Sequence, residues 1–145
     1  MATIGLDCEI VLDSNGYYVK PGSYQMQQPR IRKATVRADG AESYVDLGPG
    51  KRAWSMTILC INNLLRYDGI ASGQTGQQYR DALRTSYLGS IGATLVFSDP
   101  LNGTLQVHFD AYTEHIMDLH SQITALATGA TAAVSYEVTI KLIEA

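Results

Sequence analysis

The chain has 145 residues and a mass of 15.8 kDa, which supports one folded domain, residues 1–145, and leaves little room for a second. Hydrophobic residues make up 46% of it and charged residues 17%, a composition that excludes a disordered chain and a membrane-spanning one. The net charge of −3 argues against general binding to DNA, RNA or anionic lipid, because those surfaces are negative too.

The amino terminus has no basic region followed by an apolar stretch, and no apolar run approaches the roughly 20 residues that cross a bilayer. We therefore expect a soluble protein without a signal peptide or membrane insertion. Cys8 and Cys60 can form one disulfide at most. Each sits in an alternating apolar pattern, which favours reduced thiols in the core.

The first predicted element is a β-hairpin. Residues 6–12 alternate between apolar and polar side chains, as in a strand with one buried face. Residues 13–16 form a turn signal in which Asn15 and Gly16 tolerate positive φ, and residues 17–19 return as the partner strand.

A long extended segment follows over residues 24–37, with Pro29 confining its middle to an edge or a bend. Turns are predicted at residues 39–40 and 48–50, on either side of a short strand at 44–47. Residues 54–61 give the clearest strand. Its second face turns apolar toward the end, which predicts a central strand with Trp54 in the core.

The carboxy-terminal half carries the one predicted helix. Residues 62–73 are polar and predict a loop, after which Thr75 and Gln78 fit a capping box that begins a helix at about residues 76–88. Strands are expected at 93–98, 104–110 and 134–142, with an extended segment at 111–119 and a connection at 121–133. Roughly eight strands and one helix predict a mainly β fold, an antiparallel β-sandwich or rolled β-barrel with one packed helix.

No pattern in the chain assembles the groups of a catalytic or metal site. Five potential ligands between residues 108 and 120 share parity, but an unbroken strand separates His108 from His120 by roughly 40 Å, too far for one ion. A nucleophile elbow is missing, and residues 48–52 lack the spacing of a phosphate-binding loop. We therefore expect no enzyme activity and no cofactor. The nine tyrosines suit carbohydrate or peptide binding, but partial burial in strands and the helix explains them more simply.

The main charge asymmetry is the basic stretch of Arg30, Arg32, Lys33 and Arg37, which contains no acid. One interpretation is a solvated edge that discourages strand aggregation. The other is an interaction surface that meets the acidic carboxy-terminal part of another copy, and head-to-tail contacts of this kind close into rings when the rotation permits.

The order of these elements resembles that of tail-tube and distal-tail proteins of tailed bacteriophages. The resemblance covers about residues 30–144 and rests on the sequences VDLGPG (45–50), WSMTI (54–58), YRDAL (79–83), FSDPLNG (97–103) and YEVTI (136–140).

The resemblance implies a structural virion protein, made in the host cytoplasm, whose copies join into a ring around a DNA channel. Six copies are common in that group. The partners implied are other copies, neighbouring tail or baseplate proteins, and DNA that passes without sequence-specific binding. Members of the group often extend a long hairpin or loop onto a neighbour, and the candidates here are residues 24–46 and 110–133.

Two sets of residues follow as site candidates. The subunit-interface candidates are Arg30, Arg32, Lys33, Arg37, Lys51 and Arg52. The acidic candidates for a channel-lining or outer surface are Asp110, Glu114 and Asp118. The alternatives are a tail-terminator or head-tail connector ring and a non-viral ligand-binding β-barrel, which would need an apolar internal cavity.

Overall fold

The computed structural model of the protein describes residues 3–61, 64–70, 72–116 and 135–145. Nine strands and one helix lie in this part of the chain. They are β1 (Ile10–Leu12), β2 (Asn15–Val19), β3 (Gln25–Gln27), β4 (Arg30–Val36), β5 (Glu42–Pro49), β6 (Ala53–Cys60), α1 (Gly76–Gly89), β7 (Leu95–Asp99), β8 (Gly103–Ile116) and β9 (Tyr136–Glu144).

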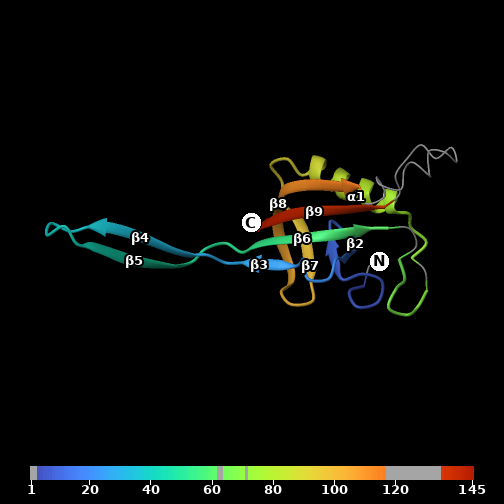
Figure 1. The fold of residues 1–145 in the computed structure, drawn as a ribbon, viewed down its shortest axis with the longest axis horizontal. Coiled ribbons are helices and arrows are strands. Elements are labelled where there is room, and N and C mark those ends of the chain that lie inside the picture. The colour runs from blue at the N-terminus through green and yellow to red at the C-terminus, as the bar shows by residue number, and fades with distance from the viewer. Residues whose placement is uncertain (1–2, 62–63, 71, 117–134) are drawn as a thin grey trace.

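Seven strands form one antiparallel sheet in the order β2-β1-β7-β8-β9-β6-β3. Since β2 also pairs with β6, the sheet closes on itself into a barrel (Figure 1). Strand β6 lies between β9 on one side and both β2 and β3 on the other. The predicted mainly β, barrel-like fold with one helix is confirmed, and β6 is central as expected.

The inward side chains of the strands fill the barrel. Trp54, Met56 and Ile58 of β6 are almost completely buried, and the ring of Trp54 meets Phe97 of β7 edge-on at 5.4 Å between centroids. The prediction that Trp54 lies in the core is therefore confirmed. Both cysteines are free and buried, which confirms the expectation of reduced core thiols, and burial raises the pKa of each to about 12.

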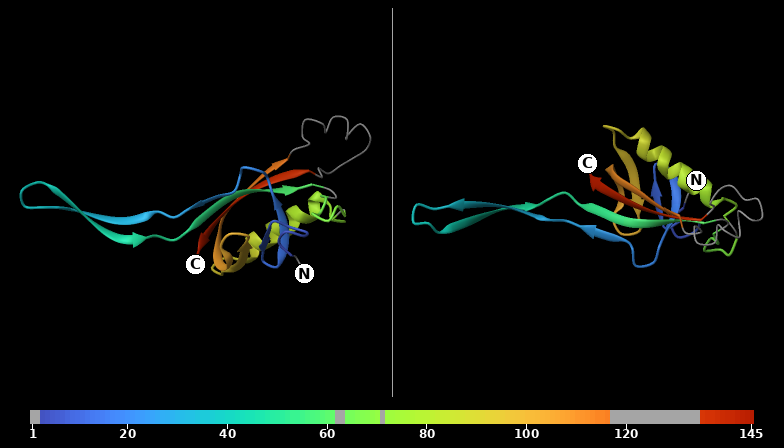
Figure 2. Two further views of the ribbon diagram at one scale, coloured as in Figure 1. Left: turned by 90° about the horizontal axis from the view of Figure 1, so that it is seen from below. Right: turned by 45° about the horizontal axis from the view of Figure 1, so that its top comes forward.

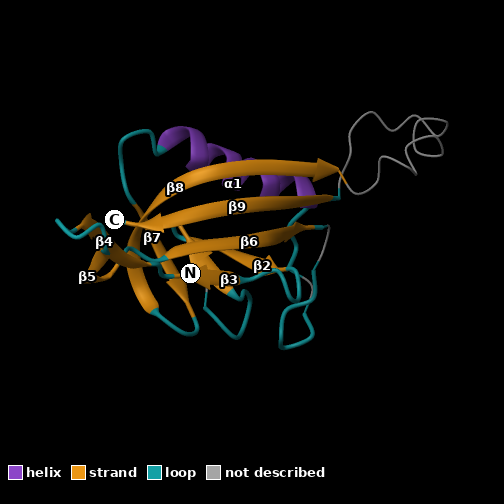
Figure 3. Ribbon diagram, turned by 60° about the vertical axis from the view of Figure 1, so that its left-hand side comes forward, coloured by secondary structure: helices purple, strands orange, loops and turns teal. Residues whose placement is uncertain are grey.

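Helix α1 runs beside β8 and β9 (Figure 3). Its first turn has the predicted capping box: the Gln78 amide donates to the Thr75 hydroxyl, and the Thr75 amide donates to the Gln78 side chain. Tyr79 and Leu83 are buried in the core. The amphipathic spacing therefore places one face of the helix against the barrel, as the sequence predicts.

Two predicted turns are wrong in detail. In the first hairpin Leu12 pairs with Asn15, so the turn consists of Asp13 and Ser14, and these two residues take φ of 51° and 66°. A two-residue turn of this kind needs positive φ at both central positions. The predicted turn at residues 48–50 is likewise wrong at its start, because Gly48 and Pro49 belong to β5 and pair with β4.

Strands β4 and β5 form a separate two-stranded sheet, which we call the arm (residues 30–49). The arm leaves the barrel where β3 and β6 end and extends far from every other element (Figures 1 and 2). Most of the arm, residues 30–46, lies in one of the two segments, residues 24–46, that the resemblance nominated as a projecting hairpin, and residues 47–49 extend beyond it. The other candidate segment falls mostly outside the described residues.

Candidate functional site

The arm is a long hairpin that contributes nothing to the core. Its strands pair from Arg30 opposite Pro49 to Val36 opposite Glu42, and all of β4 is exposed. At the tip, the amide of Arg37 donates to the carbonyl of Ala41, and Gly40 takes a φ of 82°. An isolated two-stranded hairpin is only marginally stable in water. A partner that covers the arm would therefore stabilise it.

One face of the arm carries three exposed aliphatic side chains. Alternation along the strands puts Ile31 on the same face as Val45, and Leu47 joins them at a bulge between Ile31 and Arg32. These three side chains, which we call the apolar face, are 49%, 50% and 60% exposed, respectively. Within the described residues no other element covers them.

The opposite face of the arm, which we call the polar face, carries charged side chains held by contacts within the arm, together with Val36 and Tyr44, which are 70% and 64% exposed. Arg30 donates to Asp46 at 2.6 Å, and the hydroxyl of Tyr44 donates to Glu42 at 2.7 Å. Both pairs lie in solvent, where such contacts contribute only about 0–1 kcal/mol each. The two faces differ in charge, because the face of Ile31 and Val45 carries Lys33 alone, whereas the opposite face carries four charged side chains, Arg30, Arg32, Glu42 and Asp46.

The predicted interface cations divide between the arm and its root. Arg30, Arg32, Lys33 and Arg37 all lie in the arm or at its tip. Arg37 lies 3.8 Å from Asp39, whereas Arg32 and Lys33 form no ion pair with any described residue.

Lys51 and Arg52 lie at the root. Lys51 is exposed, whereas Arg52 anchors the root: it donates from Nε to Glu144 at 2.9 Å and lies 5.6 Å above the ring of Trp54. The hydrogen bond from Arg52 lowers the pKa of Glu144.

The two acidic candidates that the structure describes, Asp110 and Glu114, do not share one surface. Strand β8 has a bulge between Phe109 and Ala111, and this shift in register ends the alternation that would have aligned Asp110 with Glu114. Asp110 is exposed at the bulge. Glu114 turns toward α1 and accepts two hydrogen bonds from Arg80, at 2.6 and 3.3 Å. Asp118 lies outside the described residues.

The Arg80–Glu114 pair fastens the helix to the barrel. Each side chain is about one quarter exposed, and Tyr112 also donates to the Glu114 carboxylate. These hydrogen bonds lower the pKa of Glu114. The pair therefore has a structural role within one subunit.

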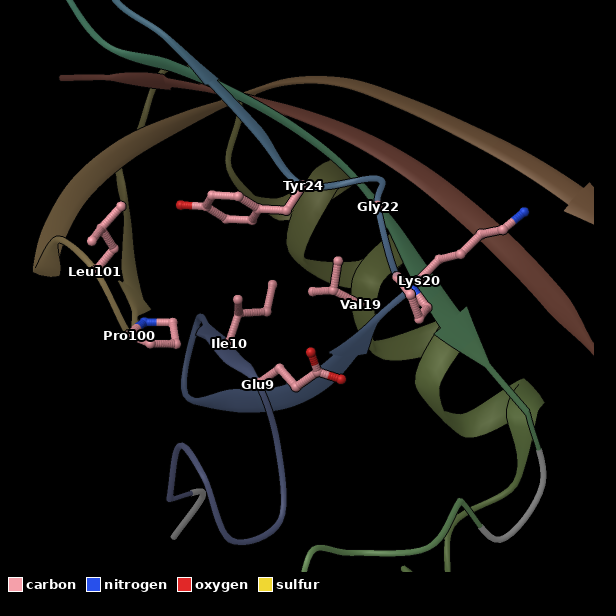
Figure 4. A pocket seen from close by; sticks show the side chains of 9 residues that line it. Glu9, Ile10, Val19, Lys20, Gly22, Tyr24, Pro100 and Leu101 are labelled. Atoms are coloured by element: carbon pink, nitrogen blue, oxygen red, sulfur yellow. The ribbon is translucent and has the colours of Figure 1, made fainter.

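A groove opens beside the root of the arm, at a gap in the barrel wall (Figure 4). One rim is formed by residues 20–24. The amide of Lys20 donates to Thr57 of β6 and Gln25 pairs with Ser55 of β6, so five residues of this segment span only two residues of β6 and the segment bows away from it. The other rim is the β7–β8 turn. Val11 of β1 pairs with Ser98 of β7, so if this pairing continued, Pro100 would lie opposite Glu9. Proline has no amide hydrogen to donate, so the strand pairing ends there.

The groove is lined largely by apolar side chains and has a volume of about 350 Å³. Ile10 and Val19 form its floor, and Leu101, 78% exposed, stands on its rim. Tyr24 spans the gap by donating a hydrogen bond to the buried carboxylate of Asp99. Burial and this carboxylate raise the pKa of the Tyr24 phenol, which therefore remains protonated.

No group of three or more metal-ligating side chains occurs among the described residues. No helix in the same part of the chain is long and apolar enough to span a membrane. A search against protein-family models finds no match, and a search of curated proteins finds none either. The arm and the groove are therefore the features on which a functional argument rests.

Proposed function

We propose that the chain is a structural protein of a bacteriophage tail or baseplate, a tail-tube or distal-tail component whose copies assemble into a ring around the DNA channel. The observation that carries this proposal is the arm, because it is a long ribbon with an apolar face that nothing in its own subunit covers. The order of elements resembles that of tail-tube and distal-tail proteins, and this resemblance is the reason for proposing a ring around a DNA channel.

Covering the apolar face gives a favourable free energy of association. Complete burial of an aliphatic side chain contributes about 1.5–3 kcal/mol, and Ile31, Val45 and Leu47 are each roughly half exposed. One arm can therefore contribute on the order of 3 kcal/mol. A ring repeats that contribution at every subunit.

The geometry favours a head-to-tail assembly. The arm points away from its own barrel (Figure 2), so its apolar face is free to bind another copy. If the arm binds a different surface on the next copy, the contact is heterologous, and such contacts form rings or filaments. Both outcomes suit a tail structure.

The outer face of the barrel is compatible with a channel wall that DNA slides past. Ser55 and Thr57 of β6 and Thr139 of β9 lie on this face, and the hydroxyls of the two threonines are 3.2 Å apart. Neutral hydroxyls do not hold phosphate as a row of cations would. The charges nearby are mixed, with Asp110 and Lys141 beside the same shallow hollow.

The packed interior favours this proposal over a ligand-binding β-barrel. A barrel that encloses a ligand needs an apolar internal cavity. Here Trp54, Phe97 and Met56 occupy the inside and are almost completely buried. A tail-terminator or connector ring would use the same arm, and imaging of the particle would distinguish these positions along the tail.

A pair of arm variants tests the proposal. Val45→Asp places a carboxylate on the apolar face, opposite Lys33, so the hairpin itself can still form. Tyr44→Asp is the matched control, because it changes the neighbouring, similarly exposed residue on the polar face. We expect the native protein and Tyr44→Asp to form rings or tubes by native mass spectrometry and electron microscopy, and Val45→Asp to remain monomeric.

Two results would contradict the proposal. One is a native protein that stays monomeric at the highest concentration that remains in solution. The other is assembly that Val45→Asp leaves intact.

A further inference from the structure

We propose that the groove between residues 20–24 and the β7–β8 turn is the receiving site for the arm of a second copy, which it contacts through the apolar face, with Lys33 of the arm meeting Glu9 of the groove. This inference rests on the proposed function and names the surface that the arm binds. The other surfaces of the barrel are outcomes of the test below.

The groove and the apolar face match in chemistry. Leu101 and Pro100 present apolar surface at the rim, above a floor formed by Ile10 and Val19, which are largely buried (Figure 4). The apolar face presents the aliphatic chains of Ile31, Val45 and Leu47. A rim leucine that is 78% exposed on a tight turn gains burial when another apolar surface covers it.

The charges also match one to one. Lys20 lines the groove but reaches away from it to Glu137, at 3.2 Å, so it does not neutralise Glu9. Within its own subunit, the Glu9 carboxylate is hydrogen-bonded to the backbone of Val19 and to the neutral phenol of Tyr67, and burial raises the pKa of Glu9. The groove therefore has one carboxylate without a cation.

The arm has the complementary cation. Lys33 lies directly opposite Val45 on the apolar face and forms no ion pair with any described residue. An apolar strip with one ammonium thus faces an apolar groove with one carboxylate. Charge pairs of this kind fix which partner binds and in what register.

The occupant is a second copy because the arm of the same chain points away from its own groove. The arm begins only a few residues beyond Tyr24 yet runs outward along the direction of β3 (Figure 1). Overall charge favours the same contact: the arm has four basic and three acidic residues, whereas the rest of the chain has seven basic and eleven acidic ones. The arm and the barrel of another copy therefore attract each other.

The first experiment changes the rim. Leu101→Asp is compared with Ile91→Asp, which alters another strongly exposed aliphatic residue on a turn, away from the groove. Fluorescence of the single, buried Trp54 confirms that each variant is folded. We expect Leu101→Asp to raise the concentration needed for half-assembly by about tenfold or more, and Ile91→Asp to leave it unchanged.

The second experiment exchanges the charges. Lys33→Glu and Glu9→Lys should each weaken assembly by about tenfold or more, because each places like charges together. The double variant should recover most of the loss. Recovery is not expected if either residue has only a role within its own subunit, since the two lie far apart in one chain.

The results separate this inference from the proposed function. Native protein that never assembles overturns the function itself. Assembly that neither Leu101→Asp nor the charge variants affect overturns the groove as the receiving site and leaves the function standing. A small apolar molecule retained by the groove in native mass spectra, together with unaffected assembly of Leu101→Asp, also overturns the inference.

Discussion

Excision of the arm should leave a folded barrel. The root closes on itself, because the amide of Gly50 donates to the carbonyl of Pro29 at 2.5 Å. Replacing residues 30–49 by two glycines therefore joins chain ends that are already adjacent. None of the residues removed belongs to the core cluster, and the contacts of Arg52 with Glu144 and Trp54 remain.

The size of the effect follows from the length of the connection. Residues 28–52, 25 in all, separate β3 from β6 in the native chain, and seven remain after excision. If the arm behaved as a flexible loop, shortening it would stabilise the barrel by (3/2)RT ln(25/7), about 1 kcal/mol. Since the arm is itself a paired ribbon, the expected gain lies between zero and that value.

Urea unfolding followed by Trp54 fluorescence measures this change, because Trp54 is the only tryptophan and is buried beside the root. Val45→Asp supplies the monomeric reference with the arm intact. An excised protein that is less stable than this reference by more than about 2 kcal/mol would refute the reasoning, since the arm would then contribute to the fold of its own subunit.

Two further predictions concern the helix and its attachment. Thr75→Ala removes the capping hydroxyl and should lower the free energy of unfolding by about 1 kcal/mol. Thr75→Ser keeps a hydroxyl, so its free energy of unfolding should stay close to that of the native protein. Equal values for the two variants would contradict the capping role. The Arg80 hydrogen bonds hold the pKa of Glu114 in the folded protein below its ordinary value of 4.5. Their contribution to stability is therefore complete above pH 4.5 and is lost as the pH falls through the lower pKa that Glu114 has in the folded protein. Urea midpoints of the native protein and Glu114→Gln should therefore differ most near neutral pH and converge in acid, and a constant difference would refute the assignment.

The alternation of side chains predicts most strands but not their irregularities. Residues 54–58 alternate between apolar and polar side chains, and β6 forms there with the expected inward face. Strand β8 shows the limit of such a prediction. Simple alternation places Asp110 and Glu114 on one face, but a bulge after Phe109 shifts the register, and Glu114 instead hydrogen-bonds to Arg80 of the helix. Nothing in the local sequence marks that extra residue, which is set by pairing with β9.

The candidate site was predictable in part. The charge pattern of Arg30, Arg32 and Lys33 identifies the segment that becomes the arm, and Pro29 marks its root. The apolar face was not recognised, because it needs the register of β4 against β5 to place Ile31 beside Val45. The groove depends on contacts between residues distant in sequence, and the only local signal for it is Pro100 at the end of a strand.

The continuity of the arm with the barrel has a mechanical consequence. Strand β5 runs through the root into β6, and β6 is paired with β9 at eight consecutive positions from Ala53 to Cys60. Tension applied at the tip of the arm acts along β6, so it loads these hydrogen bonds in shear, all together, instead of opening them one after another. A filament of such subunits would resist stretching along its arms far more strongly than peeling across them.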